Sequence, residues 1–214
     1  MSLIRRSPVK FTASPAVTNE QSGWHVVIEY QGQGEAPYLV DLSHVSKWDL
    51  QGRDLSGFSP GGLIVPETPG ASFLAEGWLI NRMNATQASV WWLGQGEGQR
   101  RPDPAAEPAY TETTDAQAFL TLIGPGLPDI VETITSMDLF APGVAVPALF
   151  QGPVLRIPCQ VALLGKNEGA EAVIVAFPRG YGQTMAEAML EAGAPYGLSP
   201  GGEGVFRKWL TSVG

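Results

Sequence analysis

The sequence predicts an α+β fold, with mixed or antiparallel sheets and two to three packed helices. Most of its apolar segments are short and rich in β-branched and aromatic residues, which is typical of strands. Other segments show apolar residues at helical spacing. Strands and helices do not alternate regularly along the chain, so a doubly wound parallel sheet is disfavoured.

Seven segments are predicted to be strands, because each joins a run of strand-forming residues to Gly, Pro or polar turn residues. They are residues 24–30, 37–43, 46–52, 88–94, 118–124, 154–165 and 172–177. In the third segment, Trp48 and Leu50 alternate with Lys47 and other polar residues. This pattern predicts a half-buried strand with Lys47 on its polar face. The adjacent Trp91 and Trp92 should point to opposite faces of their strand.

Two segments are predicted to be helices, and a third short one is expected near the end. Pro128 should open the first helix, whose apolar face would be formed by Ile130, Val131, Ile134 and Met137. Thr184 should begin the second helix as its N-cap, because Glu187 completes a capping box, and Gly193 is placed to end it. The last short helix is expected over residues 204–210.

The 214 residues are interpreted as an N-terminal extension over residues 1–22 and a single domain over residues 23–214. Residues 95–109 are the most polar part of the chain and are rich in Gly and Pro, so we expect an irregular loop there. Gly and Pro are abundant throughout, with 26 and 18 residues, which predicts many turns.

Composition excludes several classes of protein. The formal net charge of −8 disfavours nucleic acid as a partner, since phosphate binding needs clustered Lys and Arg. No run of about 18 apolar residues and no apolar signal segment is seen, so we expect a cytoplasmic protein without a membrane segment. The single cysteine, Cys159, excludes an internal disulfide and a Cys-rich metal site, and is expected to be a buried structural thiol. With His25 and His44 as the only histidines, no metal site is predicted.

Two short stretches invite a chemical interpretation. Asp41, Ser43 and His44 are the residue types of a hydrolase triad, but Ser43 and His44 would point to opposite sides of an extended segment. The favoured interpretation is a turn at a strand end, in which Ser43 and Asp41 hydrogen-bond nearby backbone. The Gly-Gly-Glu-Gly stretch at residues 201–204 could cradle an anion, yet it lacks the Lys and Ser/Thr of a phosphate-binding loop. The favoured interpretation is a flexible start to the last helix, which needs no ligand.

Four stretches in order carry a resemblance to a known family. Residues 41–54 read Asp-x-Ser-His-x-x-Lys-x-x-x-x-Gly-x-Asp, and residues 114–125 end in Ile-Gly-Pro. Residues 164–175 and 192–202 supply Gly-x-x-x-Gly-x-Glu and Ala-Gly-x-x-x-Gly-Leu-x-Pro-Gly-Gly. The pattern resembles the folate-binding aminomethyltransferase domain, the T-protein of glycine cleavage. In size and in its run Ser-Met-Asp-Leu-Phe-Ala-Pro at residues 136–142, the chain is most similar to the gamma subunit of heterotetrameric sarcosine oxidase.

This resemblance implies two alternatives for function. Where active transferases carry a catalytic aspartate, residues 77–84 hold no carboxylate, so no catalytic residue is predicted. The first alternative is a non-catalytic accessory subunit of an oxidoreductase complex in one-carbon or amine metabolism, with a flavin-dependent subunit or a second copy as partner. The second is a transferase or demethylase with tetrahydrofolate as cofactor. The residues implied to hold the cofactor are Glu171, which matches the family's pterin-binding glutamate, together with Asn81, Arg82, Ser43 and His44.

Overall fold

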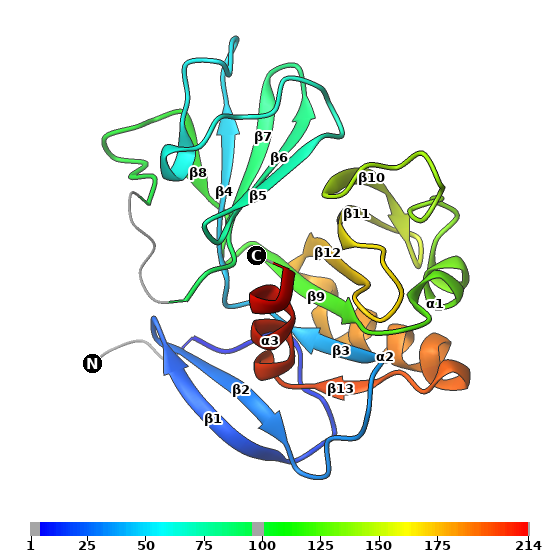
Figure 1. The fold of residues 1–214 in the computed structure, drawn as a ribbon. Coiled ribbons are helices and arrows are strands. Elements are labelled where there is room, and N and C mark those ends of the chain that lie inside the picture. The colour runs from blue at the N-terminus through cyan, green and yellow to red at the C-terminus, as the bar shows by residue number, and fades with distance from the viewer. Residues whose placement is uncertain (1–4, 96–100, 214) are drawn as a thin grey trace.

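The computed structural model describes residues 5–95 and 101–213, which form three β-sheets and three α-helices (Figure 1). The strands are β1 (Pro15–Gln21), β2 (Trp24–Tyr30), β3 (Tyr38–Asp41), β4 (Ser46–Gln51), β5 (Ser72–Ala75), β6 (Trp78–Asn84), β7 (Gln87–Trp92), β8 (Tyr110–Glu112), β9 (Gln117–Ile123), β10 (Ala148–Val154), β11 (Ile157–Gly165), β12 (Ala172–Pro178) and β13 (Ser199–Gly201). The helices are α1 (Leu127–Ile134), α2 (Gly182–Gly193) and α3 (Glu203–Val213). The predicted α+β class is confirmed.

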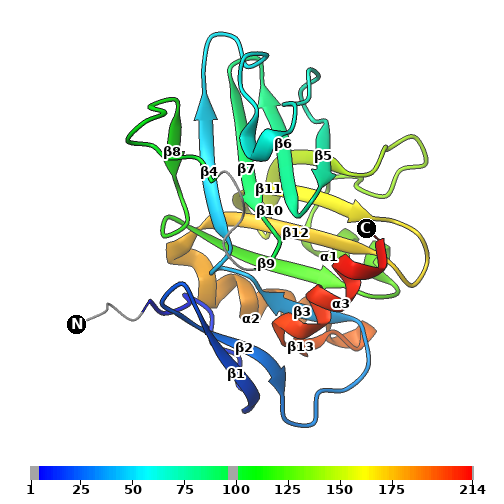
Figure 2. The same cartoon turned by 60° about the vertical axis from the view of Figure 1, so that its left-hand side comes forward.

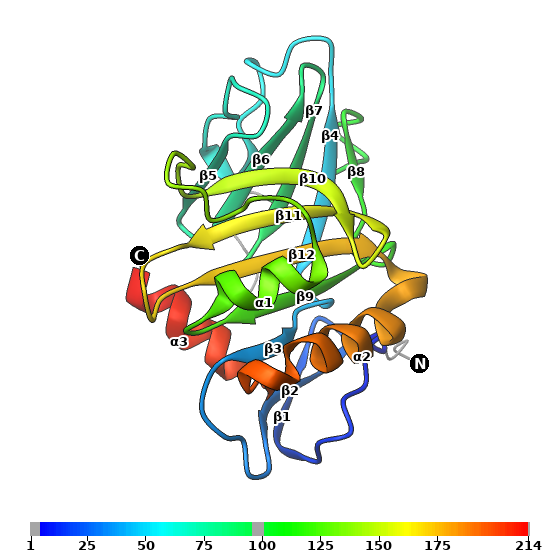
Figure 3. The same ribbon diagram turned by 90° about the vertical axis from the view of Figure 1, so that its right-hand side faces the viewer.

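The largest sheet has six strands in the order β10-β11-β12-β9-β3-β13. All its neighbours are antiparallel except β13 and β3, so the sheet is mixed, as predicted. Helices α1 and α2 cover one face of this sheet (Figure 3). Between them lies a core of aliphatic side chains such as Leu120, Val173 and Met189. Burial of these apolar side chains is the main force that holds the two helices on the sheet.

The second sheet has five antiparallel strands in the order β5-β6-β7-β4-β8 and stands above the first (Figure 2). One of its faces meets the six-stranded sheet and α3, where Trp91 and Phe119 pack edge to face with ring centroids 4.5 Å apart. Its other face carries a separate core that includes Trp48 and Trp78 and is packed by Trp92. Trp91 and Trp92 therefore serve opposite faces of β7, which confirms the prediction.

A two-stranded hairpin of β1 and β2 forms the third sheet. Residues 15–21, assigned from the sequence to an N-terminal extension, are thus paired strand residues. The hairpin packs against the beginning of α3, where a Cβ atom placed on Gly202 would lie 2.2 Å from the carbonyl oxygen of Ile28. Only glycine allows this approach, because the obstacle is backbone and cannot rotate away.

Several predicted boundaries were wrong. Residues 154–165 are not one strand, since Leu155 and Arg156 have positive φ and form the turn between β10 and β11. Thr184 is not an N-cap, because α2 begins two residues earlier, where Gly182 packs against Pro8. Met137 lies beyond the end of α1. These boundaries depend on tertiary contacts that local propensity does not report.

Other predictions can be judged in part. Helix α3 confirms the expected last helix and extends to Val213. Six strands had no prediction, namely β1, β5, β6, β8, β13 and most of β10. Part of the expected 95–109 loop lies outside the described residues. Within the described ranges, no helix has the length and apolarity required to cross a membrane.

Candidate functional site

The link from β3 to β4, residues 42–45, carries the chain from the six-stranded to the five-stranded sheet. Asp41 shapes its start: Oδ1 accepts a hydrogen bond from the Ser43 backbone N–H at 2.9 Å, and Oδ2 accepts one from the Ser7 hydroxyl. Ser43 Oγ accepts from the backbone N–H of Phe119 at 3.2 Å. Because Ser43 is committed to backbone and His44 faces another partner, the segment is the predicted turn and has no nucleophile and base in contact.

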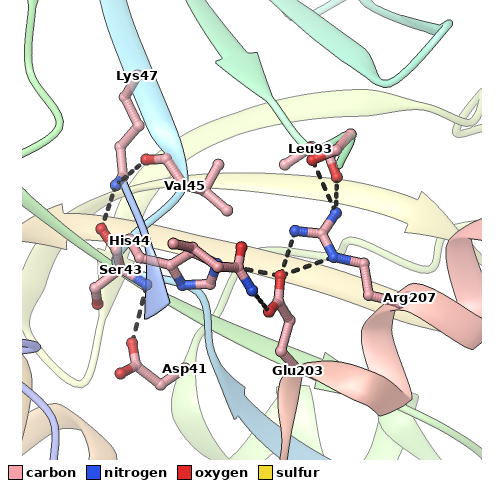
Figure 4. Close-up of polar contacts among 10 residues, drawn as sticks. Asp41, Ser43, His44, Val45, Lys47, Leu93, Glu203 and Arg207 are labelled. Atoms are coloured by element: carbon pink, nitrogen blue, oxygen red, sulfur yellow. Dashed lines mark hydrogen bonds and ion pairs between the residues drawn. The ribbon is translucent and has the colours of Figure 1, made fainter. Parts of the chain in front are cut away.

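A buried carboxylate, that of Glu203, connects the three sheets (Figure 4). Its Oε1 lies 3.1 Å from Nε2 of His44 and accepts a hydrogen bond from Nε of Arg207 at 2.7 Å. Its Oε2 accepts from Nε2 of Gln21 in β1 at 2.5 Å. The Arg207 guanidinium also donates to the carbonyl oxygens of Leu93 and Gly94, at the end of β7. The hairpin, the β3–β4 link and the five-stranded sheet are therefore all held by one residue pair on α3.

The charge of Glu203 is strongly favoured. Burial alone would raise its pKa, but the hydrogen bond and charge of His44 and the ion pair with Arg207 outweigh burial and lower the pKa to about 2. Its position in the first turn of α3 also suits a negative charge. Glu203 is consequently ionised at neutral pH and acts as a fixed acceptor, unsuited to giving up a proton.

Lys47 is fully buried between the two large sheets, so its predicted place on a polar strand face was wrong. Its Nζ donates to the carbonyl oxygens of Ser43 at 2.8 Å and Val45 at 2.7 Å and lies 4.3 Å from the centroid of the Phe119 ring. These contacts satisfy the buried ammonium group. Burial lowers the pKa of Lys47 to about 7, against the attraction of Asp41.

A cavity of about 920 Å³ lies between the hairpin and the chain before it. Its wall is built by residues 6–15 and by β1 and β2, and Asp41, His44 and Gly201 close one side. Its volume is within the usual range for small-molecule sites. The lining mixes aromatic, cationic and carboxylate side chains, so this cavity is the principal candidate binding site in the described part of the chain.

The outer wall of the cavity is fixed by specific contacts. Ser7 accepts a hydrogen bond from the Val9 N–H while bonding to Asp41. Lys10 exchanges two backbone hydrogen bonds with the Gln183 side chain on α2, at 2.8 and 3.1 Å. The segment before β1 is therefore held against the six-stranded sheet and forms a preformed cavity wall.

The five residues implied to hold a folate fall into three separate places. Ser43 and His44 occupy the β3–β4 link, and only His44 lines the large cavity. Asn81 is buried in β6 and hydrogen-bonds Ser72 and Ser89, while Arg82 donates to backbone carbonyls of the next turn.

Glu171 lies just before β12, and its buried Oε2 has no hydrogen-bond partner among the described residues. Among the described residues no hydrogen bond joins these three places, and their binding of one folate stays a prediction.

Sequence reasoning missed Glu203, Arg207 and Lys47 as the central polar groups. Glu203 stands in the Gly-Gly-Glu-Gly stretch, where Gly202 serves close packing against β2 and its N–H donates to Gln33 Oε1. The stretch thus has a packing role, and the Gly202 amide is not free to bind an anion. The sequence signal that could have indicated Glu203 was a lone acidic residue at the start of a predicted helix.

The comparisons place this architecture among known folds. No family model and no curated protein sequence matches the chain. Its structure is similar to that of a chain of heterotetrameric sarcosine oxidase from Corynebacterium sp. U-96 in complex with pyrrole 2-carboxylate. The TM-score is 0.59 at 11% identity, over 74% of this chain and 84% of that one.

A second similar structure is the glycine cleavage system aminomethyltransferase T from Bartonella henselae. The TM-score is 0.55 at 14% identity, and the match covers 88% of this chain but only 56% of the transferase. The chain therefore has an aminomethyltransferase-like fold, which confirms the fold implied by the sequence resemblance.

Proposed function

We propose that this chain is a non-catalytic accessory subunit that supports a flavin-dependent oxidoreductase complex in one-carbon or amine metabolism. The similarity to a chain of heterotetrameric sarcosine oxidase carries the proposal. The structural match covers similar fractions of this chain and of the sarcosine oxidase chain, so the two chains are close in length. The larger aminomethyltransferase, by contrast, extends well beyond the matched region.

The composition of β6 supports an accessory role. The equivalent family stretch carries a catalytic aspartate, whereas β6 offers Asn81 and Arg82. The Asn81 amide bonds within the sheet, and the Arg82 guanidinium bonds the adjacent turn. Neither group can serve as a carboxylate base.

The buried polar residues also fit a structural role. The carboxylate of Glu203 and the guanidinium of Arg207 meet each other, and they also meet His44, the Gln21 amide and backbone carbonyls of other elements. A subunit whose ionic groups join sheets is suited to present a defined surface to a partner.

The single cysteine suits a cytoplasmic location, which we include in the proposal.

Co-expression tests the partnership. The full chain, carrying an affinity tag, is expressed with flavin-dependent dehydrogenase subunits from the same genome, those of neighbouring genes first, and purified by size exclusion. A complex with flavin absorbance and a fixed subunit ratio is expected, and its amine-oxidising activity should depend on this chain. A chain that elutes alone or as a self-associated species, with a fully active dehydrogenase beside it, would refute the proposal.

A tetrahydrofolate-dependent transferase or demethylase is the second candidate, favoured by the unpartnered Oε2 of Glu171. A buried carboxylate oxygen without a donor suits the amino-pyrimidine edge of a pterin. Calorimetric titration with 5-formyltetrahydrofolate separates the two candidates. The accessory role predicts no heat of binding, and the transferase role predicts binding that Glu171→Gln weakens while Glu168→Gln, in the exposed turn before it, does not.

A further inference from the structure

Two side chains at the wall of the large cavity carry unused hydrogen-bonding atoms. Tyr30 and His44 both line the cavity, and neither the Tyr30 hydroxyl nor Nδ1 of His44 bonds a described residue. Both atoms are accessible, unlike Nε1 of Trp24 in the same cavity, which is sealed from it. Accessible polar atoms in a mostly apolar cavity are the groups that orient a ligand.

The partner of His44 determines which of its ring nitrogens can accept a hydrogen bond. Nε2 lies 3.1 Å from the carboxylate of Glu203 (Figure 4), and this carboxylate is ionised and can only accept. Nε2 therefore carries a proton, so Nδ1 is an acceptor whenever the imidazole is neutral. The contact with Glu203 also holds the ring in place at the cavity wall.

Asp41 adds a carboxylate on the same side of the cavity. Its two oxygens accept hydrogen bonds from the Ser43 N–H and the Ser7 hydroxyl, and each oxygen keeps a second lone pair. Burial, and then the charge of Asp41, raise the pKa of Tyr30 to about 12, so the carboxylate is close to the Tyr30 side chain. This side of the cavity therefore offers three acceptors, from Asp41, Tyr30 and His44.

The cavity also holds charges of both signs, and they are kept apart. Four charged side chains line it, and their formal charges cancel: Arg6, Lys10, Glu20 and Asp41. Among the described residues, none of the four forms an ion pair. A ligand with a single charge gains no net attraction from such a lining, whereas a zwitterion can place each of its charges near the opposite one.

The remaining wall is apolar and suits a hydrocarbon group. Val9, Phe11 and Val26 are buried side chains of the lining. Phe11 packs edge to face with Tyr30, with ring centroids 5.9 Å apart, so the apolar wall adjoins the acceptors. The cavity volume of about 920 Å³ leaves ample room for a molecule of the size of an amino acid.

We propose that this cavity binds a free amino acid with an apolar side chain, whose ammonium group donates to the Asp41 carboxylate, the Tyr30 oxygen and Nδ1 of His44. Three acceptors match the three N–H groups of a primary ammonium. The ligand's carboxylate is attracted by the two cationic side chains of the lining, and its side chain lies against the apolar wall. This site goes beyond the accessory role and does not depend on it. Of the residues implied to hold a folate, only Ser43, through its backbone, and His44 are near it.

Calorimetric titration of the full chain at neutral pH tests the proposal, with L-phenylalanine and L-leucine as probes. At least one of the two should bind in a saturable manner. The N-acetyl derivative of that amino acid lacks the ammonium group, and its amide lacks the carboxylate. Each derivative should bind at least about tenfold more weakly, because a charge-assisted contact is lost.

Two variants test the acceptors. Tyr30→Phe removes a hydroxyl that bonds no described residue, and Asp41→Asn removes the charge of the carboxylate. Each should raise the Kd about tenfold. Tyr196→Phe and Asp129→Asn make the same chemical changes at exposed positions outside the cavity and should leave the Kd unchanged.

Thermal unfolding shows whether a variant keeps its fold. Tyr30→Phe should keep the Tm of the unaltered chain, because no hydrogen bond to a described residue is lost, so its result decides even if Asp41→Asn is unstable. The proposal fails if neither amino acid binds, if either derivative binds as tightly as the free amino acid, or if Tyr30→Phe with an unchanged Tm leaves the Kd unchanged. The co-expression result is independent of these outcomes.

Discussion

The imidazole of His44 and the carboxylate of Glu203 lie 3.1 Å apart, although the two residues are 159 positions apart in the chain. Glu203 also bonds Gln21 and Arg207, so two segments from the first quarter of the sequence and one from its last part meet at one carboxylate. A buried carboxylate with several donors is stabilising as a unit and costly to take apart. The stability of the whole fold should therefore depend on Glu203 more than on any exposed acidic residue.

Glu203→Gln should lower the free energy of unfolding by about 3 kcal/mol, because it removes the buried charge that pairs with the partly buried Arg207. Urea unfolding at neutral pH measures the change. Glu35→Gln, at an exposed position, is the matched control and should stay within about 0.5 kcal/mol of the unaltered chain. Equal stability of the two variants would contradict the role given to Glu203.

The same residue predicts a pH dependence. Its pKa falls from an ordinary 4.5 to about 2 in the folded chain, so the unfolded chain takes up a proton first as the solution is acidified. The stabilisation is complete above pH 4.5 and is lost as the pH falls towards 2. Glu203→Gln should lack this component, and the stability difference between the two proteins should shrink across that interval.

Lys47 predicts a second interval, at neutral to alkaline pH, in which stability also rises with pH. Its pKa falls from 10.5 to about 7 on folding, so between these values the unfolded chain binds a proton that the folded chain does not. The free energy of unfolding should rise with pH by up to about 1.4 kcal/mol per unit in this interval. Lys47→Met should remove that rise, as urea unfolding at several pH values would show. Parallel slopes for the two proteins would mean that Lys47 keeps an ordinary pKa.

Gly202→Ala should destabilise the chain by about 3 kcal/mol, since the new methyl group would collide with the backbone of Ile28. The hairpin and α3 would have to separate, and the Tm should fall accordingly. Gly180→Ala, with open space around the added carbon, is the control and should change the Tm little. A harmless Gly202→Ala would show that the hairpin can shift without cost.

Cys159 should react slowly with iodoacetamide in the folded chain. Burial raises the pKa of its thiol from 9.0 to about 11, which reduces the thiolate fraction at neutral pH about a hundredfold. In urea, the reaction should reach the rate of an ordinary free thiol. Rapid labelling of the folded chain would overturn the expectation of an inert structural cysteine, and Cys159→Ser shows that labelling occurs there.

The fold class could be predicted because strand composition and turn residues act locally. The alternation of Trp91 and Trp92 and the apolar runs of β9 and β12 follow from the side-chain period of a strand. Lys47 could not be placed, because its burial depends on Phe119 and on carbonyls that the β3–β4 link turns towards it. Local alternation gives the face of a strand but not whether a second sheet covers that face.

The polar centre was harder to predict than the fold. Ser43 and His44 were predicted as site residues from a short stretch that also contains Asp41. The partner of His44 in the structure is Glu203, which no local sequence pattern connects to it. The Gly-rich stretch suggested a ligand loop, and its glycine proved necessary for packing against Ile28. Contacts between segments far apart in the chain determine both the partner of His44 and the role of Gly202. Local sequence patterns do not report such contacts.

The hairpin's attachment to α3 has a consequence for how the protein is made. Much of the cavity wall comes from residues 6–30, which are synthesised before Gly201, which closes one side, and before Glu203, which binds Gln21. Domains form progressively during synthesis, so the β1–β2 segment must wait without its final neighbours while some 170 residues are added. The cavity is accordingly complete only after residues 201–203 have been synthesised and have packed against the hairpin.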